Sequence, residues 1–123
     1  MGFNFNEDSP IYLQIANSIE DGILNGIYQE ESQIPSTTEI SITYKINPAT
    51  VGKGFNILVN EGIIYKKRGV GMFVSTGAVK KLLTNRKNKF FDNYILTLMS
   101  EAKRLGITVD EIINMIKGGN YHE

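Results

Sequence analysis

Two signals for the start of a helix lie close together in the middle of the chain. The first, Ser36-Thr37-Thr38-Glu39, is a capping box, in which the serine and glutamate side chains satisfy exposed N–H groups at a helix start. The second, Asn47-Pro48, combines a capping side chain with a proline at the first helical position. Only a short helix, ending near Tyr44, fits between them before a tight turn leads into the next helix. This spacing predicts a helix-turn-helix.

Longer helices are predicted around these signals. Ser9-Pro10 predicts a first helix over residues 10–25, with Ser9 as its N-cap and Asn25-Gly26 as its stop. The helix that starts at Asn47-Pro48 is expected to end at Gly62. The helix over residues 10–25 has the apolar stripe Ile11, Ile15, Ile19, Ile23 and Leu24. The helix that starts at Asn47-Pro48 has the apolar stripe Val51, Phe55, Leu58 and Val59.

The apolar pattern changes to a period of two residues after Gly62. Ile63–Tyr65 and Met72–Val74 are predicted strands, and the basic segment 66–71 between them has the glycines of a hairpin turn. A helix, a helix-turn-helix and a basic β-hairpin, in this order, describe a winged helix. The expected fold is therefore mainly α with a small β-hairpin.

The segment after Gly77 is predicted to be helical. Its apolar residues recur at helical spacing over about 25 residues up to Gly106, and Thr108–Glu111 is a capping box for a last short helix before Gly118-Gly119. With a boundary near Ser75, we expect a winged domain over residues 1–75 and a helical tail over residues 76–123. The apolar residues of the long helix are Val79, Leu82, Leu83, Phe90, Phe91, Ile95, Leu98, Met99, Ala102 and Leu105.

Length and composition restrict the function. At 123 residues the chain has room for one domain with an appendage, so large enzyme scaffolds are excluded. It has no cysteine and one histidine, His122, which we expect in a mobile tail, so metal sites and catalytic triads lack most of their ligands. We expect no enzyme activity and no cofactor. No apolar run approaches the roughly 20 residues that span a bilayer, and no leader is evident, so we expect a cytoplasmic protein without membrane contact.

The net charge of zero hides a segregation of charges along the chain. Residues 1–44 contain acids and no Lys or Arg, whereas residues 45–89 contain many basic residues and one acid, Glu61. This asymmetry favours an anionic partner, and for a winged helix we expect double-stranded DNA as that partner. In such a unit the helix that starts at Asn47-Pro48, the expected recognition helix, can enter the major groove, while the hairpin tip reaches the flanking backbone or the minor groove. The exposed N–H groups at helix starts suit phosphate oxygens. The candidate DNA contacts are Ser36, Thr37, Asn47, Pro48, Ala49, Thr50, Lys53, Lys66, Lys67 and Arg68.

Four segments together resemble a known family. They are Pro10-Ile-Tyr-Leu-Gln-Ile-Ala16, Ile34-Pro-Ser-x-x-Glu39, Ile46-Asn-Pro-Ala-Thr-Val-x-Lys53 and Glu61-Gly-Ile-Ile-Tyr-x-x-Arg-Gly-x-Gly-x-Phe-Val74. Over residues 10–75 the chain resembles the DNA-binding half of the GntR family of bacterial transcription regulators. The Asn-Pro-x-Thr-Val motif and the short tail are similar to the YtrA subfamily, which implies that two tail helices serve for dimerisation.

The resemblance adds site residues and departures. It implies that Gly69 and Gly71 face DNA together with the matching contacts named above. Thr38, a further candidate contact, stands where many family members carry Arg, which bonds phosphate or guanine as no threonine can. Gly52 and Gly54 lie inside the recognition helix, where each costs up to about 1 kcal/mol relative to Ala. These glycines either permit a close approach of the helix to DNA or keep the helix flexible until it binds DNA.

The apolar stripe of the tail is too long for a two-helix hairpin to bury. We expect a second copy to cover it, so that a twofold dimer presents two recognition helices to an inverted repeat, with repression as the expected mode of regulation. Two alternatives stay open: a winged helix that binds a protein or RNA, and a switch whose tail binds an unidentified small-molecule effector. The candidate dimer contacts are Phe91, Ile95, Leu98, Met99 and Ala102.

Overall fold

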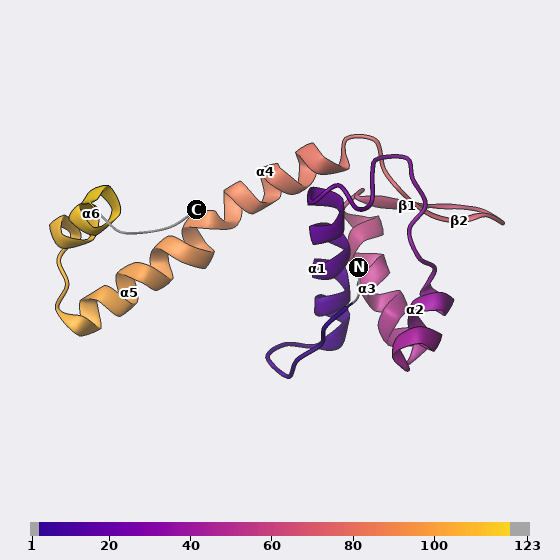
Figure 1. Ribbon diagram of the computed structural model, residues 1–123, viewed down its shortest axis with the longest axis horizontal. Coiled ribbons are helices and arrows are strands. Elements are labelled where there is room, and N and C mark those ends of the chain that lie inside the picture. The colour runs from indigo at the N-terminus through magenta and orange to yellow at the C-terminus, as the bar shows by residue number, and fades with distance from the viewer. Residues whose placement is uncertain (1–2, 119–123) are drawn as a thin grey trace. The chain divides into compact units, whose positions relative to one another are not determined.

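The computed structural model describes residues 3–118, and Figure 1 labels its helices and strands. The chain divides into two compact units, a winged unit up to Thr84 and a tail unit from Asn85. The mainly helical fold with one small hairpin that the sequence predicts is confirmed. In chain order the elements are α1 (Ile11–Leu24), α2 (Thr37–Tyr44), α3 (Pro48–Asn60), β1 (Ile64–Lys67), β2 (Gly71–Val74), α4 (Ala78–Phe90), the π-helical segment η1 (Phe91–Ile95), α5 (Leu96–Leu105) and α6 (Val109–Gly118).

The winged unit has a closed apolar core. α1 and α3 pack against each other because each carries an apolar stripe at helical spacing (Figure 1). α2 contributes Ile40, and the first turns of α4 contribute Ala78 and Leu82, which are 0% and 1% exposed. The start of α4 thus belongs structurally to the winged unit. The largest fully buried side chains are Ile15, Ile19, Ile23, Ile40, Leu58, Ile63, Ile64, Leu82, Val51 and Val74.

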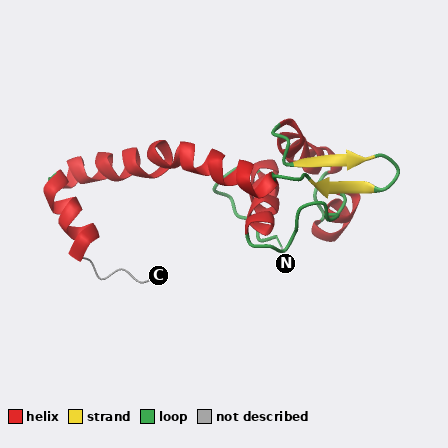
Figure 2. Ribbon diagram, turned by 90° about the horizontal axis from the view of Figure 1, so that it is seen from above, coloured by secondary structure: helices red, strands yellow, loops and turns green. Residues whose placement is uncertain are grey.

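β1 and β2 form an antiparallel hairpin, yellow in Figure 2, in which Ile64 lies opposite Val74. Residues 31–34, which we call the edge segment, pair with the outer side of β2. The Glu31 N–H donates to the Val74 carbonyl (2.8 Å), and the Ile34 N–H donates to the Met72 carbonyl (2.9 Å). This third, short β-like edge was not predicted from the sequence.

Two local predictions are wrong. α1 has Pro10 at its N-cap position and no side-chain cap, so Ser9 does not cap the helix. The Gln14 amide, in the first turn, donates to the carbonyls of Asn6 (2.9 Å) and Ser9 (2.7 Å) and so ties the preceding segment to the helix. Val59, predicted in the apolar stripe of α3, is 39% exposed, whereas its neighbour Leu58 takes the inward position.

Helical hydrogen bonding continues from Ala78 to Leu105, as predicted, although η1 has π-helical geometry. Gly106 ends this stretch with a left-handed φ of 73°. The predicted capping box starts α6: the Glu111 N–H donates to Thr108 Oγ1 (3.1 Å), and the Thr108 N–H donates to the Glu111 carboxylate (3.0 Å). The expectations for Gly119 and His122 fall outside the described residues.

Candidate nucleic-acid interface

The predicted capping box closes the start of α2. The Glu39 N–H donates to Ser36 Oγ (3.0 Å), and the Ser36 N–H donates to the Glu39 carboxylate (3.2 Å). Thr37, half-buried, and Thr38, exposed, open the helix between them. Because Glu39 already places a negative charge at this helix start, a phosphate gains less here than at a helix start without an acid.

The start of α3 is the better anion site of the two. Asn47 Oδ1 accepts the Ala49 N–H at 2.8 Å, Pro48 follows as the first helical residue, and the first turn contains no acid. Asn47, Pro48 and Ala49 are exposed, and Thr50 is half-buried. Asn47 uses its side-chain oxygen for the cap, so its NH₂ group remains as a donor. This helix start therefore combines a positive dipole end with exposed polar groups.

The turn between α2 and α3 exposes a basic residue that the sequence analysis did not select. Lys45 has a left-handed conformation (φ 55°, ψ 47°), which is uncommon for a residue other than glycine. Two hydrogen bonds fix this turn. The Ile46 N–H donates to the Ser41 carbonyl (3.1 Å), and the Ser41 hydroxyl donates to the Ile46 carbonyl (2.6 Å). The positive charge of Lys45 within a predicted helix-turn-helix was the available signal.

Lys53 of α3 is held by an aromatic ring of α1. Its Nζ atom lies 4.0 Å from the centroid of the Tyr12 ring. Such a cation–π contact contributes about 0.5–1 kcal/mol at exposed sites. Tyr12 therefore positions the ammonium group that the sequence analysis assigned to DNA. Tyr12 could not be recognised from the sequence, because this pairing requires the packing of α1 on α3.

The predicted basic cluster lies at the end of β1 and in the turn that follows. Lys66 and Lys67 are the last two residues of β1, whereas the sequence predicted them in the turn, and Arg68 begins the turn. Lys66, Lys67 and Arg68 are exposed, and Gly69 has a φ of 76°, a conformation that favours glycine. The Nζ atom of Lys67 lies 4.3 Å from the centroid of the Phe73 ring. The hairpin thus positions one lysine along its own surface.

The edge segment supports the hairpin tip through Gln33. The Gln33 side-chain amide donates to the Val70 carbonyl at 3.0 Å. Gly71 has a φ of 146°, and a Cβ atom on it would overlap the Gln33 amide nitrogen. The positive φ therefore favours glycine at position 71 within the fold itself, and a side chain there would also displace the Gln33 amide. This is separate from the DNA contact that the resemblance implies.

Two adjacent carboxylates, which we call the Glu30–Glu31 latch, join the edge segment to the hairpin and to α4. Glu31 accepts hydrogen bonds from the Tyr65 hydroxyl (2.5 Å), the Thr76 hydroxyl (2.6 Å) and the Thr76 N–H (3.1 Å). Glu30 accepts the Gly77 and Val79 N–H groups (2.9 and 3.2 Å) at the start of α4. The bonds from Thr76 and then Tyr65 hold the pKa of Glu31 below its ordinary value, and the bond to Glu31 raises the pKa of Tyr65.

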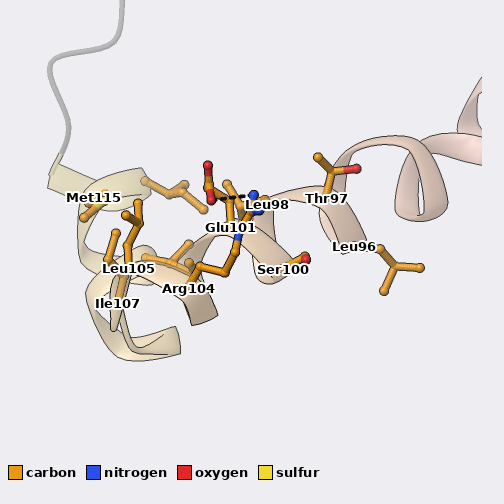
Figure 3. Close-up of a pocket in the computed structure, with 12 residues that line it drawn as sticks. Leu96, Thr97, Leu98, Ser100, Glu101, Arg104, Leu105, Ile107 and Met115 are labelled. Atoms are coloured by element: carbon orange, nitrogen blue, oxygen red, sulfur yellow. Dashed lines mark ion pairs between the residues drawn. The ribbon is translucent and has the colours of Figure 1, made fainter.

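The tail unit contains an open apolar groove of about 690 Å³ between α5 and α6 (Figure 3). Glu101 and Arg104, both in its lining, form an ion pair at 2.7 Å, dashed in the figure. Ala102 is 6% exposed and is therefore covered within the tail itself. Of the other candidate dimer contacts, Ile95 is half-buried. The exposed ones are Phe91 (56%), Leu98 (44%) and Met99 (37%).

The described residues 3–118 present exposed polar and basic groups on several elements. Within that range no three His, Cys, Asp or Glu side chains are grouped so that they could hold a metal ion. No described helix has the length and apolarity needed to cross a membrane.

Comparison with known proteins identifies the family. Residues 11–74 match the family model for bacterial regulatory proteins of the gntR family. The HTH-type transcriptional repressor YtrA of Bacillus subtilis is 31% identical over 109 residues, which cover 89% of this chain and 83% of YtrA.

Solved structures extend the comparison. A putative transcriptional regulator of the GntR family from Bacteroides thetaiotaomicron has a TM-score of 0.71 and 39% identity, covering 88% of this chain and 94% of that one. AraR(DBD), solved in complex with operator ORX1, has a TM-score of 0.54 and 26% identity, covering 58% of this chain and 93% of that one. The chain therefore belongs to the GntR family of bacterial regulatory proteins, as a YtrA-like DNA-binding transcription regulator and not an enzyme.

Proposed function

We propose that the chain represses transcription by binding an inverted-repeat operator as a homodimer. The observation that carries the proposal is the contrast in burial: the winged unit encloses its own core, whereas the tail unit leaves a series of large apolar side chains exposed. YtrA is named a repressor, and AraR(DBD) binds an operator, which supports both the mode of regulation and the use of the winged unit for DNA.

In this proposal α3 supplies sequence recognition. A major groove about 12 Å wide admits a helix, with residues of its N-terminal half against base edges. Asn47–Thr50 and Lys53 lie in that half. Lys66, Lys67, Arg68 and the Gly69 backbone contact the flanking sugar–phosphate chain, and Ser36–Thr38 contact phosphates at the start of α2. Lys45, next to the start of α3, adds a further phosphate contact.

The proposed division of labour assigns DNA recognition to residues 1–75 and dimerisation to residues 76–123, with the first turns of α4 completing the winged core. Joining two winged units makes the second half-site contact intramolecular, at an effective concentration around millimolar. The dimer contacts are Phe91, Ile95, Leu98 and Met99, while Ala102 supports them from within the tail.

Selection of bound fragments from genomic DNA in vitro tests the proposal. The selected fragments should share an inverted repeat, and the full chain should sediment as a dimer at micromolar concentrations. A monomer that binds an asymmetric site with full affinity would refute dimeric recognition. A structured RNA that competes as well as the selected duplex would favour the winged helix as an RNA-binding module.

A second candidate function, an effector switch, rests on the groove of the tail. Its volume of about 690 Å³ lies in the range of small-molecule pockets, about 300–1,000 Å³. An effector bound there would be largely apolar. Thermal melting of the full chain with a panel of apolar compounds, followed by DNA binding in the presence of any that raise the melting temperature, tests this function.

A further inference from the structure

α3 contains two glycines whose surroundings differ. Glycine weakens a helix interior relative to alanine, so each residue calls for a reason. Gly54 is buried, and a Cβ atom on it would lie 2.7 Å from the Tyr12 carbonyl oxygen and 3.3 Å from Ile15 side-chain carbons. Gly54 therefore serves packing, because it lets α1 and α3 approach each other closely.

Gly52 has no such reason within the protein. A Cβ atom placed on it meets no heavy atom within 4 Å, and the residue is half-exposed. Its φ lies outside the left-handed region, since it is helical like its neighbours. Neither packing nor backbone conformation explains the glycine at this position.

The position of Gly52 on the helix relates it to the proposed DNA contacts. Residues at i, i+3, i+4 and i+7 share one side of a helix, which places Gly52 beside Ala49, Lys53 and Asn56. This side is opposite to Val51, Phe55 and Leu58, which are buried. Ala49 carries only a methyl group, and Lys53 is held over the Tyr12 ring. Between Ala49 and Lys53, therefore, no large side chain projects from the surface of α3, and the ammonium group of Lys53 lies beside this gap.

We propose that Gly52 is an affinity determinant of the DNA interface: its missing side chain lets the α3 backbone approach the duplex closely. This inference rests on the proposed function of α3. A methyl group at position 52 would displace the helix from the duplex by a distance on the order of 1 Å, which would stretch the hydrogen bonds of Asn47, Thr50 and Lys53 beyond their favourable range. The cost falls on binding and not on folding.

If α3 were instead flexible and became ordered only on binding DNA, the substitution would have the opposite effect on affinity. If Gly52 served only to keep α3 flexible, alanine would pre-order the helix and tighten DNA binding, because less conformational entropy would be lost on association. Gly52→Ala therefore separates the two roles by the sign of its effect on affinity.

The experiment uses the full-length chain and four proteins: wild type, Gly52→Ala, Gly54→Ala and Asn60→Ala. Thermal melting is measured without DNA, and equilibrium binding is measured on the duplex that the wild-type chain selects from genomic DNA. Asn60→Ala is the matched control, because Asn60 is an exposed residue at the far end of the same helix and alanine raises helix propensity there too.

Gly52→Ala should raise the melting temperature by a few degrees and weaken binding to the selected duplex by about tenfold. Asn60→Ala should leave affinity unchanged, and Gly54→Ala should lower the melting temperature. A Gly52→Ala chain that binds as well as wild type or better, or that melts far below it, overturns the inference alone. A wild-type chain that selects no duplex overturns the proposed function, and the inference with it.

Discussion

The winged unit and the tail unit carry similar helical stripes of apolar residues but bury them differently. In the winged unit the stripes of α1 and α3 close on each other, and side chains such as Ile15 and Leu58 are 0% exposed. Within residues 85–118, only Ala102 and Ile112 are buried, while Leu105 and Ile116 are 66% and 60% exposed. Helical periodicity therefore identifies an apolar face, but does not say whether the chain itself or a partner covers that face.

The largest effect is expected when the residues after Thr84 are removed, because this deletes the tail unit and leaves the winged unit. Ala78 and Leu82 remain in the shortened chain, so the winged unit should fold as a monomer. Linkage of two binding units raises affinity by roughly 10²–10⁴-fold, and the shortened chain should lose about this factor on the inverted repeat. Its affinity for a single half-site should stay that of one winged unit. Sedimentation equilibrium and binding titrations measure both outcomes.

A cut after Ser75 is the control for that experiment. It removes Ala78 and Leu82 from the core as well, so this shorter chain should melt at a clearly lower temperature or fail to fold. If the chain cut after Thr84 still sedimented as a dimer, the interface would lie in the winged unit.

Two leucine-to-alanine variants compare the units at single positions. Leu58→Ala, at a fully buried site, should lower the free energy of unfolding by about 2–5 kcal/mol. Leu98→Ala, at a side chain 44% exposed, should leave the unfolding of the winged unit unchanged and shift the monomer–dimer equilibrium towards monomer. Denaturant unfolding and sedimentation distinguish them. Equal losses of unfolding free energy would mean that the units share one core.

Charge removal tests whether DNA binding belongs to the winged unit alone. The double variant Lys66→Ala with Lys67→Ala should weaken binding to every duplex and make the salt dependence of log K shallower by about two. Lys103→Ala with Lys117→Ala removes the same charge from exposed positions of the tail and should leave the slope unchanged. Equal changes of slope in both variants would place the tail at the DNA. Titrations over a series of salt concentrations give these slopes.

The smallest effect is expected from a substitution in the Glu30–Glu31 latch, and it should appear in how the melting temperature depends on acidic pH. Because hydrogen bonds hold the pKa of Glu31 below its ordinary value in the folded state, its stabilising contribution is present at neutral pH and is lost as the pH falls through the folded-state pKa. Glu31→Gln should therefore lower the melting temperature at neutral pH and flatten its decline in acid. Melting curves over a pH series measure this. Thr76→Val, which removes one donor to Glu31, should add little to Glu31→Gln.

Local signals in the sequence predicted the elements well. The capping boxes at Ser36 and Thr108 and the Asn47-Pro48 start are confirmed, since each cap is complete within four residues and needs no tertiary contact. The prediction at Ser9 is wrong because α1 begins one residue later than expected, at Ile11, so that Pro10, which has no side-chain acceptor, occupies the N-cap position.

The sequence showed less of how the candidate site is held together. The basic residues of α3 and the hairpin were apparent from charge and position. Their supports were not: Gln33 and Val70 are 37 positions apart, and Glu31 and Thr76 are 45 apart. Nothing in the polar segment before Ile34 marks it as a strand, and only packing brings it beside β2.

The edge segment also affects how the protein behaves at high concentration. A hairpin has two outer edges, and an unpaired strand edge can recruit strands of other molecules and seed aggregates. Residues 31–34 occupy the edge of β2, and the short β1 at the other edge carries the exposed Lys66 and Lys67, whose charges oppose the approach of another strand. The lysines proposed to contact phosphate thus also help to keep the protein dispersed. Variants that place large apolar side chains there should therefore aggregate before their DNA binding can be measured.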